Sequence, residues 1–151
     1  MIQRIQTIYL LATVILTSLV IAFPLMEIIS GEGVFYTVTV LGAYVDKSME
    51  YSVWVLLALC IVNILVSLAA ITQFKKRILQ MRLSTFNVLI TVGFYVMLGG
   101  YYWILKERFS ASEIAFNWTV VLPAINIILT YLSIRAIGRD EALVRATERL
   151  R

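Results

Sequence analysis

The side chains that could do chemistry inside the long apolar runs of this chain are uncharged amides and hydroxyls. The set consists of Asn63, Ser67, Asn87, Asn126 and Thr130. Asn63 and Ser67 are four residues apart, as are Asn126 and Thr130, so each pair lies on one face of a helix. Such groups form hydrogen bonds between membrane helices. We expect this packing role. The alternative is a polar ligand cavity between the apolar run that contains Asn63 and the one that contains Asn126.

The chemistry that is missing narrows the possible functions. No Asp, Glu, Lys or Arg lies inside the runs, the chain has no histidine, and Cys60 is its single cysteine. Ion pumps, voltage sensors and proton-coupled carriers usually place ionisable groups at membrane depth, while haem carriers need axial ligands and thiol oxidoreductases a cysteine pair. Neither a nucleophile with its base nor a metal-ligand cluster is visible. We therefore expect no enzymatic activity, no metal and no cofactor.

Four stretches without Asp, Glu, Lys or Arg must position these groups. They cover residues 5–26, 51–74, 83–105 and 114–134. Each has the roughly 20 apolar residues that a helix needs to cross a bilayer. Hydrophobic residues make up 61% of the chain and charged residues 15%, too few to cover a water-soluble domain. The sequence predicts an all-α integral membrane protein, a four-helix transmembrane bundle formed as one domain by residues 1–151.

The basic residues predict an orientation. The segments before the first run, between the second and third, and after the fourth hold ten Lys and Arg, against three in the other two connections. Because positively charged short loops stay in the cytoplasm, both termini and the 75–82 loop should be cytoplasmic. Trp54, Trp103 and Trp118 then fall at the outer ends of three spans, where indole rings favour the membrane interface.

A set of polar residues at the predicted cytoplasmic ends is a candidate surface for partners or lipids. It consists of Gln3, Arg4, Gln6, Lys75, Lys76, Arg77, Arg82, Arg139, Arg145 and Arg149. The net charge is +4, and the basic residues flank apolar spans without forming a patch interleaved with aromatic residues. We therefore expect anionic lipid head groups as partners and no nucleic acid. Plain topology signalling explains the same charges, and a membrane-protein partner or a homo-oligomer stays open.

The segments outside the spans carry two further predictions. Within the outer segment 27–50, the β-branched and aromatic run 34–41 is bounded by glycines and predicts a strand, with residues 43–45 as its return partner. Such a short β-hairpin-like segment is marginal alone and must lean on the helix ends, the lipid or another protein. The cytoplasmic tail 135–151 predicts an amphipathic helix, continuous with the fourth span or hinged at Gly138.

Both ends of the chain carry a resemblance. Residues 1–9, MIQRIQTIY, and residues 139–145, RDEALVR, with RLR at 149–151, resemble the two signatures of domain of unknown function family 4293. That resemblance implies a small four-span inner-membrane protein of Bacteroidota and supplies no activity and no catalytic residues. Because both signatures lie on the predicted cytoplasmic side, we expect Gln3, Arg4 and Gln6 to lie near the tail and form a joint inner surface.

These observations favour one function and leave a second open. We expect a non-catalytic scaffold or accessory subunit of a complex in the bacterial inner membrane, with partners at the inner surface or the outer segment. The alternative is a transporter-like protein that binds a small molecule or lipid in a polar intramembrane cavity.

Overall fold

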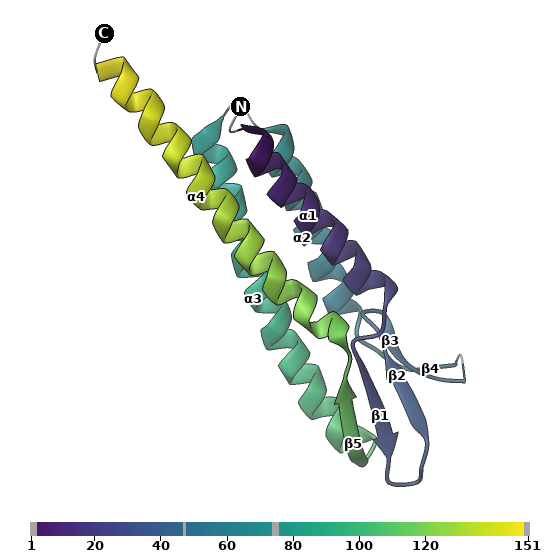
Figure 1. Ribbon diagram of the computed structural model, residues 1–151. Coiled ribbons are helices and arrows are strands. Elements are labelled where there is room, and N and C mark those ends of the chain that lie inside the picture. The colour runs from purple at the N-terminus through teal and green to yellow at the C-terminus, as the bar shows by residue number, and fades with distance from the viewer. Residues whose placement is uncertain (1–2, 47, 74–75, 150–151) are drawn as a thin grey trace.

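The computed structural model describes residues 3–46, 48–73 and 76–149, with the backbone alone for residues 3, 4 and 145–149. Its helices are α1 (Gln3–Ala22), α2 (Trp54–Thr72), α3 (Arg77–Arg108) and α4 (Leu122–Arg149). They lie side by side in the ring order α1, α2, α3, α4 (Figure 1). By length and composition, all four could cross a membrane.

A five-stranded antiparallel sheet covers one end of the bundle, so the prediction of an all-α fold with one hairpin-like segment is wrong. Its strands are β1 (Met26–Ser30), β2 (Phe35–Val38), β3 (Gly42–Val45), β4 (Ser48–Ser52) and β5 (Ala111–Phe116). Their order is β4-β3-β2-β1-β5. We call this end of the bundle the sheet end, and the opposite end, where both chain termini lie in Figure 1, the terminal end.

Strand β5 is one of three strands that make the sheet larger than predicted, with β1 and β4 as the others. It comes from the connection between α3 and α4 and pairs with β1, setting Met26 opposite Phe116 and Ile28 opposite Ile114. In β1, Met26 and Ile28 are buried while Glu27 between them is exposed, as expected when one face of a sheet is covered. The β1–β2 pair thus gains β5 as a third strand, which removes the weakness of an isolated two-stranded ribbon.

The strands also shorten three of the predicted spans. Helix α1 ends at Ala22, because Pro24 and the start of β1 follow. Residues 51–52 belong to β4, and residues 114–116 to β5. The 3₁₀ helix η1 (Trp118–Val121) then leads into α4. A short apolar run does not by itself distinguish a buried strand from a helix end.

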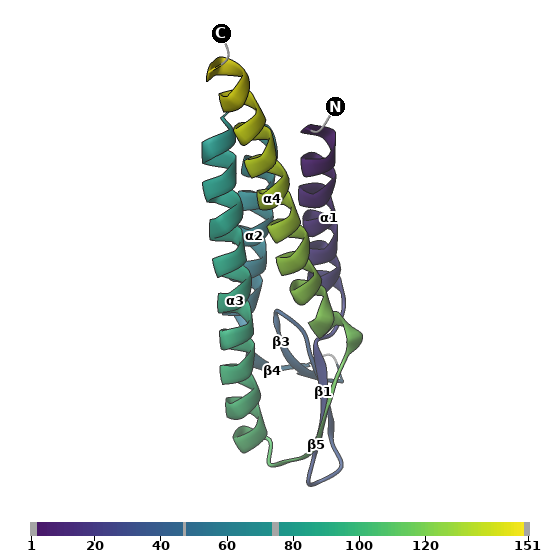
Figure 2. The same cartoon turned by 60° about the vertical axis from the view of Figure 1, so that its left-hand side comes forward.

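Helix α3 extends past its predicted span at both ends. It has 32 residues, about 48 Å at 1.5 Å per residue. Its last turns run alongside the sheet beyond the other helices (Figure 2). There Leu98 and Leu105 are buried in one core with sheet residues such as Met26 and Val38. Helix α4 continues without interruption through Gly138 into the predicted tail.

Buried residues follow the same spacing of alternating four- and three-residue steps on every helix. They are Gln6, Leu10, Thr13, Thr17 and Val20 on α1; Leu56, Cys60, Asn63, Ser67 and Ala70 on α2; Gln80, Ser84, Asn87, Thr91 and Phe94 on α3; and Asn126, Thr130, Ser133, Ile137 and Asp140 on α4. This is the heptad repeat of a packed helix seam. Ile8, Leu65, Leu89 and Ile128 point outward and are exposed. Polar groups inside and apolar groups outside are typical of helices surrounded by lipid.

Candidate functional site

Hydrogen bonds between side chains join α1, α2 and α3 at mid-bundle. The Thr17 hydroxyl lies 3.2 Å from Asn63 Oδ1, within donating distance, and Asn63 Nδ2 donates to Thr91 Oγ1 at 2.9 Å. All three side chains are 5% exposed or less. A single asparagine on α2 therefore links the helices on either side of it.

A second layer lies one helical turn closer to the terminal end. Asn87 Nδ2 on α3 donates to Ser67 Oγ on α2 at 2.8 Å, and the hydroxyls of Ser67 and Thr13 are 3.3 Å apart. The sequence predicted Asn63, Ser67 and Asn87 as interhelical contacts, whereas their partners Thr13, Thr17 and Thr91 were missed. The heptad spacing of the threonines was the signal that could have found them.

Helix α4 enters this arrangement through Asn126, whose Nδ2 donates to Thr17 Oγ1 at 2.9 Å. Thr130 and Ser133 follow on the same buried face of α4. We use the term polar core for the buried uncharged residues of the two layers and of this face. These are Thr13, Thr17, Asn63, Ser67, Asn87, Thr91, Asn126, Thr130 and Ser133.

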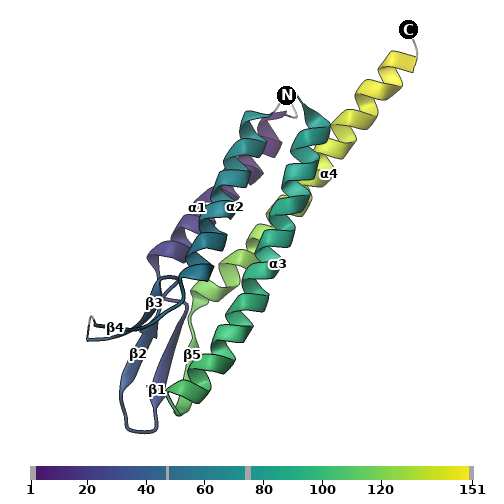
Figure 3. The same ribbon diagram turned by 180° about the vertical axis from the view of Figure 1, so that it is seen from behind.

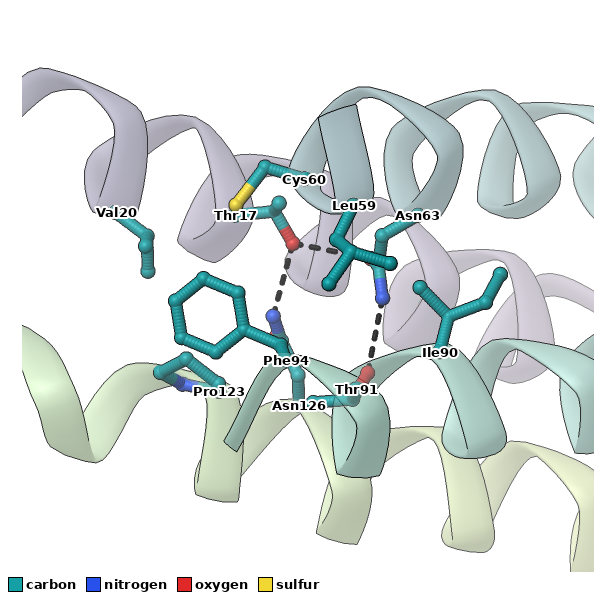
Figure 4. Close-up of a pocket in the computed structure, with 10 residues that line it drawn as sticks. All are labelled: Thr17, Val20, Leu59, Cys60, Asn63, Ile90, Thr91, Phe94, Pro123 and Asn126. Atoms are coloured by element: carbon teal, nitrogen blue, oxygen red, sulfur yellow. Dashed lines mark hydrogen bonds between the residues drawn. The ribbon is translucent and has the colours of Figure 1, made fainter. Parts of the chain in front are cut away.

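A small cavity lies at the side of the polar core that faces the sheet end (Figure 4). Its volume is about 20 Å³, enough for a single water molecule. The residues around it are Thr17, Val20, Leu59, Cys60, Asn63, Ile90, Thr91, Phe94, Pro123 and Asn126. Polar atoms therefore meet an apolar wall at this point.

Several buried polar atoms in the described residues have no hydrogen-bond partner. Four of them lie on α3 and α4, namely Ser84 Oγ, Asn87 Oδ1, Asn126 Oδ1 and Ser133 Oγ, and the fifth is Thr119 Oγ1 in η1. The hydroxyls of Thr13 and Thr17 on α1 all have partners. Most of these unpaired hydrogen-bonding atoms thus lie on the faces of α3 and α4 that point into the bundle.

A second polar cluster closes the terminal end. Gln6 Nε2 donates to Asp140 Oδ2 at 3.0 Å, across 134 residues of sequence, and the Arg77 guanidinium donates to the backbone oxygen of Asp140 at 3.1 Å. Asp140 is only 8% exposed, and Gln80 on α3 is 2% exposed. The sequence placed Asp140 in the predicted tail and Gln6 near that tail, but it did not predict that the two side chains are buried together. The position of Asp140 fourteen residues after Asn126, on the same heptad face, was the missed signal.

Comparison with known families adds an assignment. Residues 2–150 match the family model described as Domain of unknown function (DUF4293). The chain belongs to the DUF4293 family. The resemblance seen at both ends of the sequence is thereby confirmed, and it extends over nearly the whole chain. Among curated proteins, no sequence matches this chain.

In this DUF4293 chain, the predicted partner or lipid surface is not a single cluster. Gln6 is buried and Arg77 is half-buried, and both contact Asp140, whereas Lys76, Arg82 and Arg139 are exposed. Only the backbone is described for three of the predicted residues: Gln3 and Arg4 in the first turn of α1, and Arg149 at the end of α4. The side chain of Arg145 likewise lies outside the description, as does all of Lys75.

The three tryptophans of this family member are all exposed, but they do not share one level of the bundle. Trp54 begins α2 and Trp118 begins η1, where its ring lies 5.5 Å from that of Phe23. Trp103 lies farther along α3, beside the sheet, and its Nε1 donates to Glu107 at 2.7 Å. In the described part of the chain, no group of three or more His, Cys, Asp or Glu could hold a metal ion.

Proposed function

We propose that this DUF4293 protein is a non-catalytic integral membrane scaffold or accessory subunit of a complex in the bacterial inner membrane. The observation that carries the proposal is the way the interior is used. Seven of the nine side chains of the polar core form hydrogen bonds with one another, and the cavity beside them has a volume of about 20 Å³. Binding sites for small molecules usually measure about 300–1,000 Å³. The functional surface is then the outside of the molecule.

Within this proposal, both termini are cytoplasmic. The ten-to-three distribution of Lys and Arg supports this orientation. It gives the exposed Lys76, Arg82 and Arg139 anionic lipid head groups as neighbours at the cytoplasmic face. The sheet then lies on the periplasmic side.

The sheet offers a surface on which a partner protein could dock. Strand β4 is the last in the sheet order, so one of its edges has no strand beside it in the part of the chain that the structure describes. It projects away from the bundle (Figure 3), and Met49, its second residue, is 52% exposed. Unpaired strand edges present backbone donors and acceptors that other chains can bind.

Site-specific crosslinking in native membranes tests the scaffold role. A photoreactive amino acid at Met49 should capture a defined partner protein, whereas the same group at Leu65, on the outward face of α2, should give lipid adducts. A tagged chain extracted in mild detergent should co-purify with that partner at fixed stoichiometry, as measured by mass spectrometry. Recovery of the bare chain in repeated extractions, with the same adducts at both positions, would contradict the proposal.

A transporter-like role is the second candidate, and the cavity beside Asn126 is the observation that favours it. Transport would require α3 and α4 to separate, because the present cavity is too small for a metabolite. Ordered density larger than water between the helices, lost in Asn126→Leu, would support this role. A core that holds only protein atoms and water in every captured state would contradict it.

A further inference from the structure

We propose that the cavity beside Asn126 is a binding site for one water molecule, which completes the hydrogen bonds of the polar core. The proposal concerns the interior and is independent of the scaffold role. It rests on three observations: the number of hydrogen atoms available around the cavity, the unpartnered amide of Asn126, and the size of the space.

The hydroxyls around the cavity supply too few hydrogen atoms. Thr17 Oγ1 lies 2.8 Å from the backbone oxygen of Thr13 and 3.2 Å from Asn63 Oδ1, but one hydroxyl hydrogen can serve only one of them. Thr91 donates its hydrogen to the backbone oxygen of Asn87 at 2.9 Å. When Thr17 takes the shorter bond, Asn63 Oδ1 loses its donor.

The amide of Asn126 adds a second unmet requirement. Its Nδ2 donates to Thr17 Oγ1, while its Oδ1 has no partner among the described residues although Asn126 is only 3% exposed. Turning the amide around would exchange the two atoms and leave a nitrogen in place of an oxygen without a partner. In either orientation a buried polar atom needs a ligand, because an unpaired amide is costly in an apolar environment.

Water matches the space and these needs. A volume of about 20 Å³ holds one water molecule and excludes any metabolite. Its two hydrogens can serve Asn63 Oδ1 and Asn126 Oδ1, and its lone pairs can accept the second amide hydrogen of either side chain. The lining of the cavity contains no Asp, Glu, Lys or Arg, which favours a neutral ligand. Figure 4 shows these side chains converging from all four helices.

Nuclear magnetic resonance in lipid nanodiscs with deuterated lipids tests the site. Methyl groups of Val20, Leu59 and Ile90 line the cavity and report directly on its contents. We expect cross-relaxation between these methyls and a long-lived water molecule, and a matching signal at the Asn126 amide. Leu89, which precedes Thr91 by less than a turn, lies on the outward face of α3, is 62% exposed and should show none.

Two variants that remove the water by different routes complete the test. Asn126→Leu removes the polar atom, and Val20→Leu fills the space while all polar groups remain. Both should abolish the methyl–water signals, and Thr85→Val on the outward face of α3 should retain them. Because Val20→Leu leaves the interhelical bonds in place, it reports on the site even if Asn126→Leu fails to fold.

A dry cavity is the outcome that would overturn the proposal. The absence of a methyl–water signal at Val20, Leu59 and Ile90 of the wild-type protein would show that the site does not bind water. Methyl–water signals that persist unchanged in both variants would also overturn it, because the water would then lie elsewhere.

Discussion

Each hydrogen bond in the polar core contributes only modestly to stability. The cost of removing one depends on whether its buried partner is left unpaired. Thr91 and Thr85 show this on one helix. Both hydroxyls donate to the backbone oxygen four residues earlier, but Thr91 also accepts a bond from Asn63, while Thr85 is exposed and accepts none among the described contacts. Interhelical bonds of this kind contribute about 0.6 kcal/mol on average in membrane proteins, and a buried donor left without its acceptor costs about 1–3 kcal/mol.

The two threonines provide a matched pair of variants. We expect Thr91→Val to lower the free energy of unfolding by about 1 kcal/mol, because Asn63 Nδ2 loses its acceptor with almost no change in side-chain volume. Thr85→Val should be neutral within about 0.5 kcal/mol. Reversible unfolding in bicelles measures both values. Equal effects of the two substitutions would show that the interhelical bond contributes nothing.

The contact between Gln6 and Asp140 should appear as coupling in a double-mutant cycle. We expect the destabilisation by Gln6→Leu and by Asp140→Leu to be non-additive by about 1 kcal/mol, because either change already breaks the single bond of 3.0 Å. The control cycle combines Gln6→Leu with Arg139→Leu, at the adjacent and exposed position, and its two effects should be additive. Additivity in both cycles would remove this contact from the account of how α4 is held at the terminal end.

At the scale of elements, the sheet ties the two connections at its end of the bundle together. Strand β1 is paired on one side with β2, its neighbour in sequence, and on the other with β5, more than eighty residues away. The β3–β4 pair continues the sheet outward, and its close approach depends on Gly42. A Cβ atom at this position would lie 2.6 Å from the backbone oxygen of Tyr51 on β4.

Gly42→Ala should therefore weaken the pairing of β3 with β4. We expect a loss of about 2 kcal/mol, because the added methyl group forces two backbones apart. Hydrogen exchange of peptides covering residues 42–52 should accelerate, while exchange in α2 stays unchanged. Gly100→Ala is the control, because its Cβ would meet nothing within 4 Å and alanine favours a helix. Unchanged exchange in β4 would mean that the strand moves away at little cost.

At the scale of the whole molecule, α3 extends from one end of the bundle to the other. Lys76 precedes its first turn and Lys106 lies in its last turn, about 45 Å apart along the helix axis, and both are exposed. That distance exceeds the hydrocarbon thickness of about 30 Å. In the proposed orientation the two lysines lie on opposite sides of the membrane.

An impermeant amine reagent should distinguish the two lysines. We expect Lys106 to react in right-side-out vesicles and Lys76 only in inverted ones, with the sites of labelling identified by mass spectrometry of peptides. Detergent-solubilised protein, in which both should react, controls for reactivity. Labelling of Lys76 in sealed right-side-out vesicles would reverse the proposed topology.

Much of the helical part of this fold could be predicted because the length and the composition of an apolar run are local properties of the sequence. A run of about 20 apolar residues must satisfy its backbone within itself, so composition alone located four helices. The four-residue spacing of Asn63 and Ser67 placed them on one face of a helix, because side chains at positions i and i+4 lie above one another. The signatures at the two ends of the chain were sufficient to indicate the DUF4293 family.

The sheet and the terminal-end cluster were decided only by the tertiary structure. Residues 114–116 are apolar enough for a span, and they become a strand because β1 offers them backbone partners from the opposite connection. The sequence placed Gln6 near the tail that contains Asp140, but the buried contact between these two side chains, 134 residues apart, depends on α4 continuing past Gly138. Contacts at such separations depend on how the helices pack against one another, and no local pattern of residue types specifies that packing.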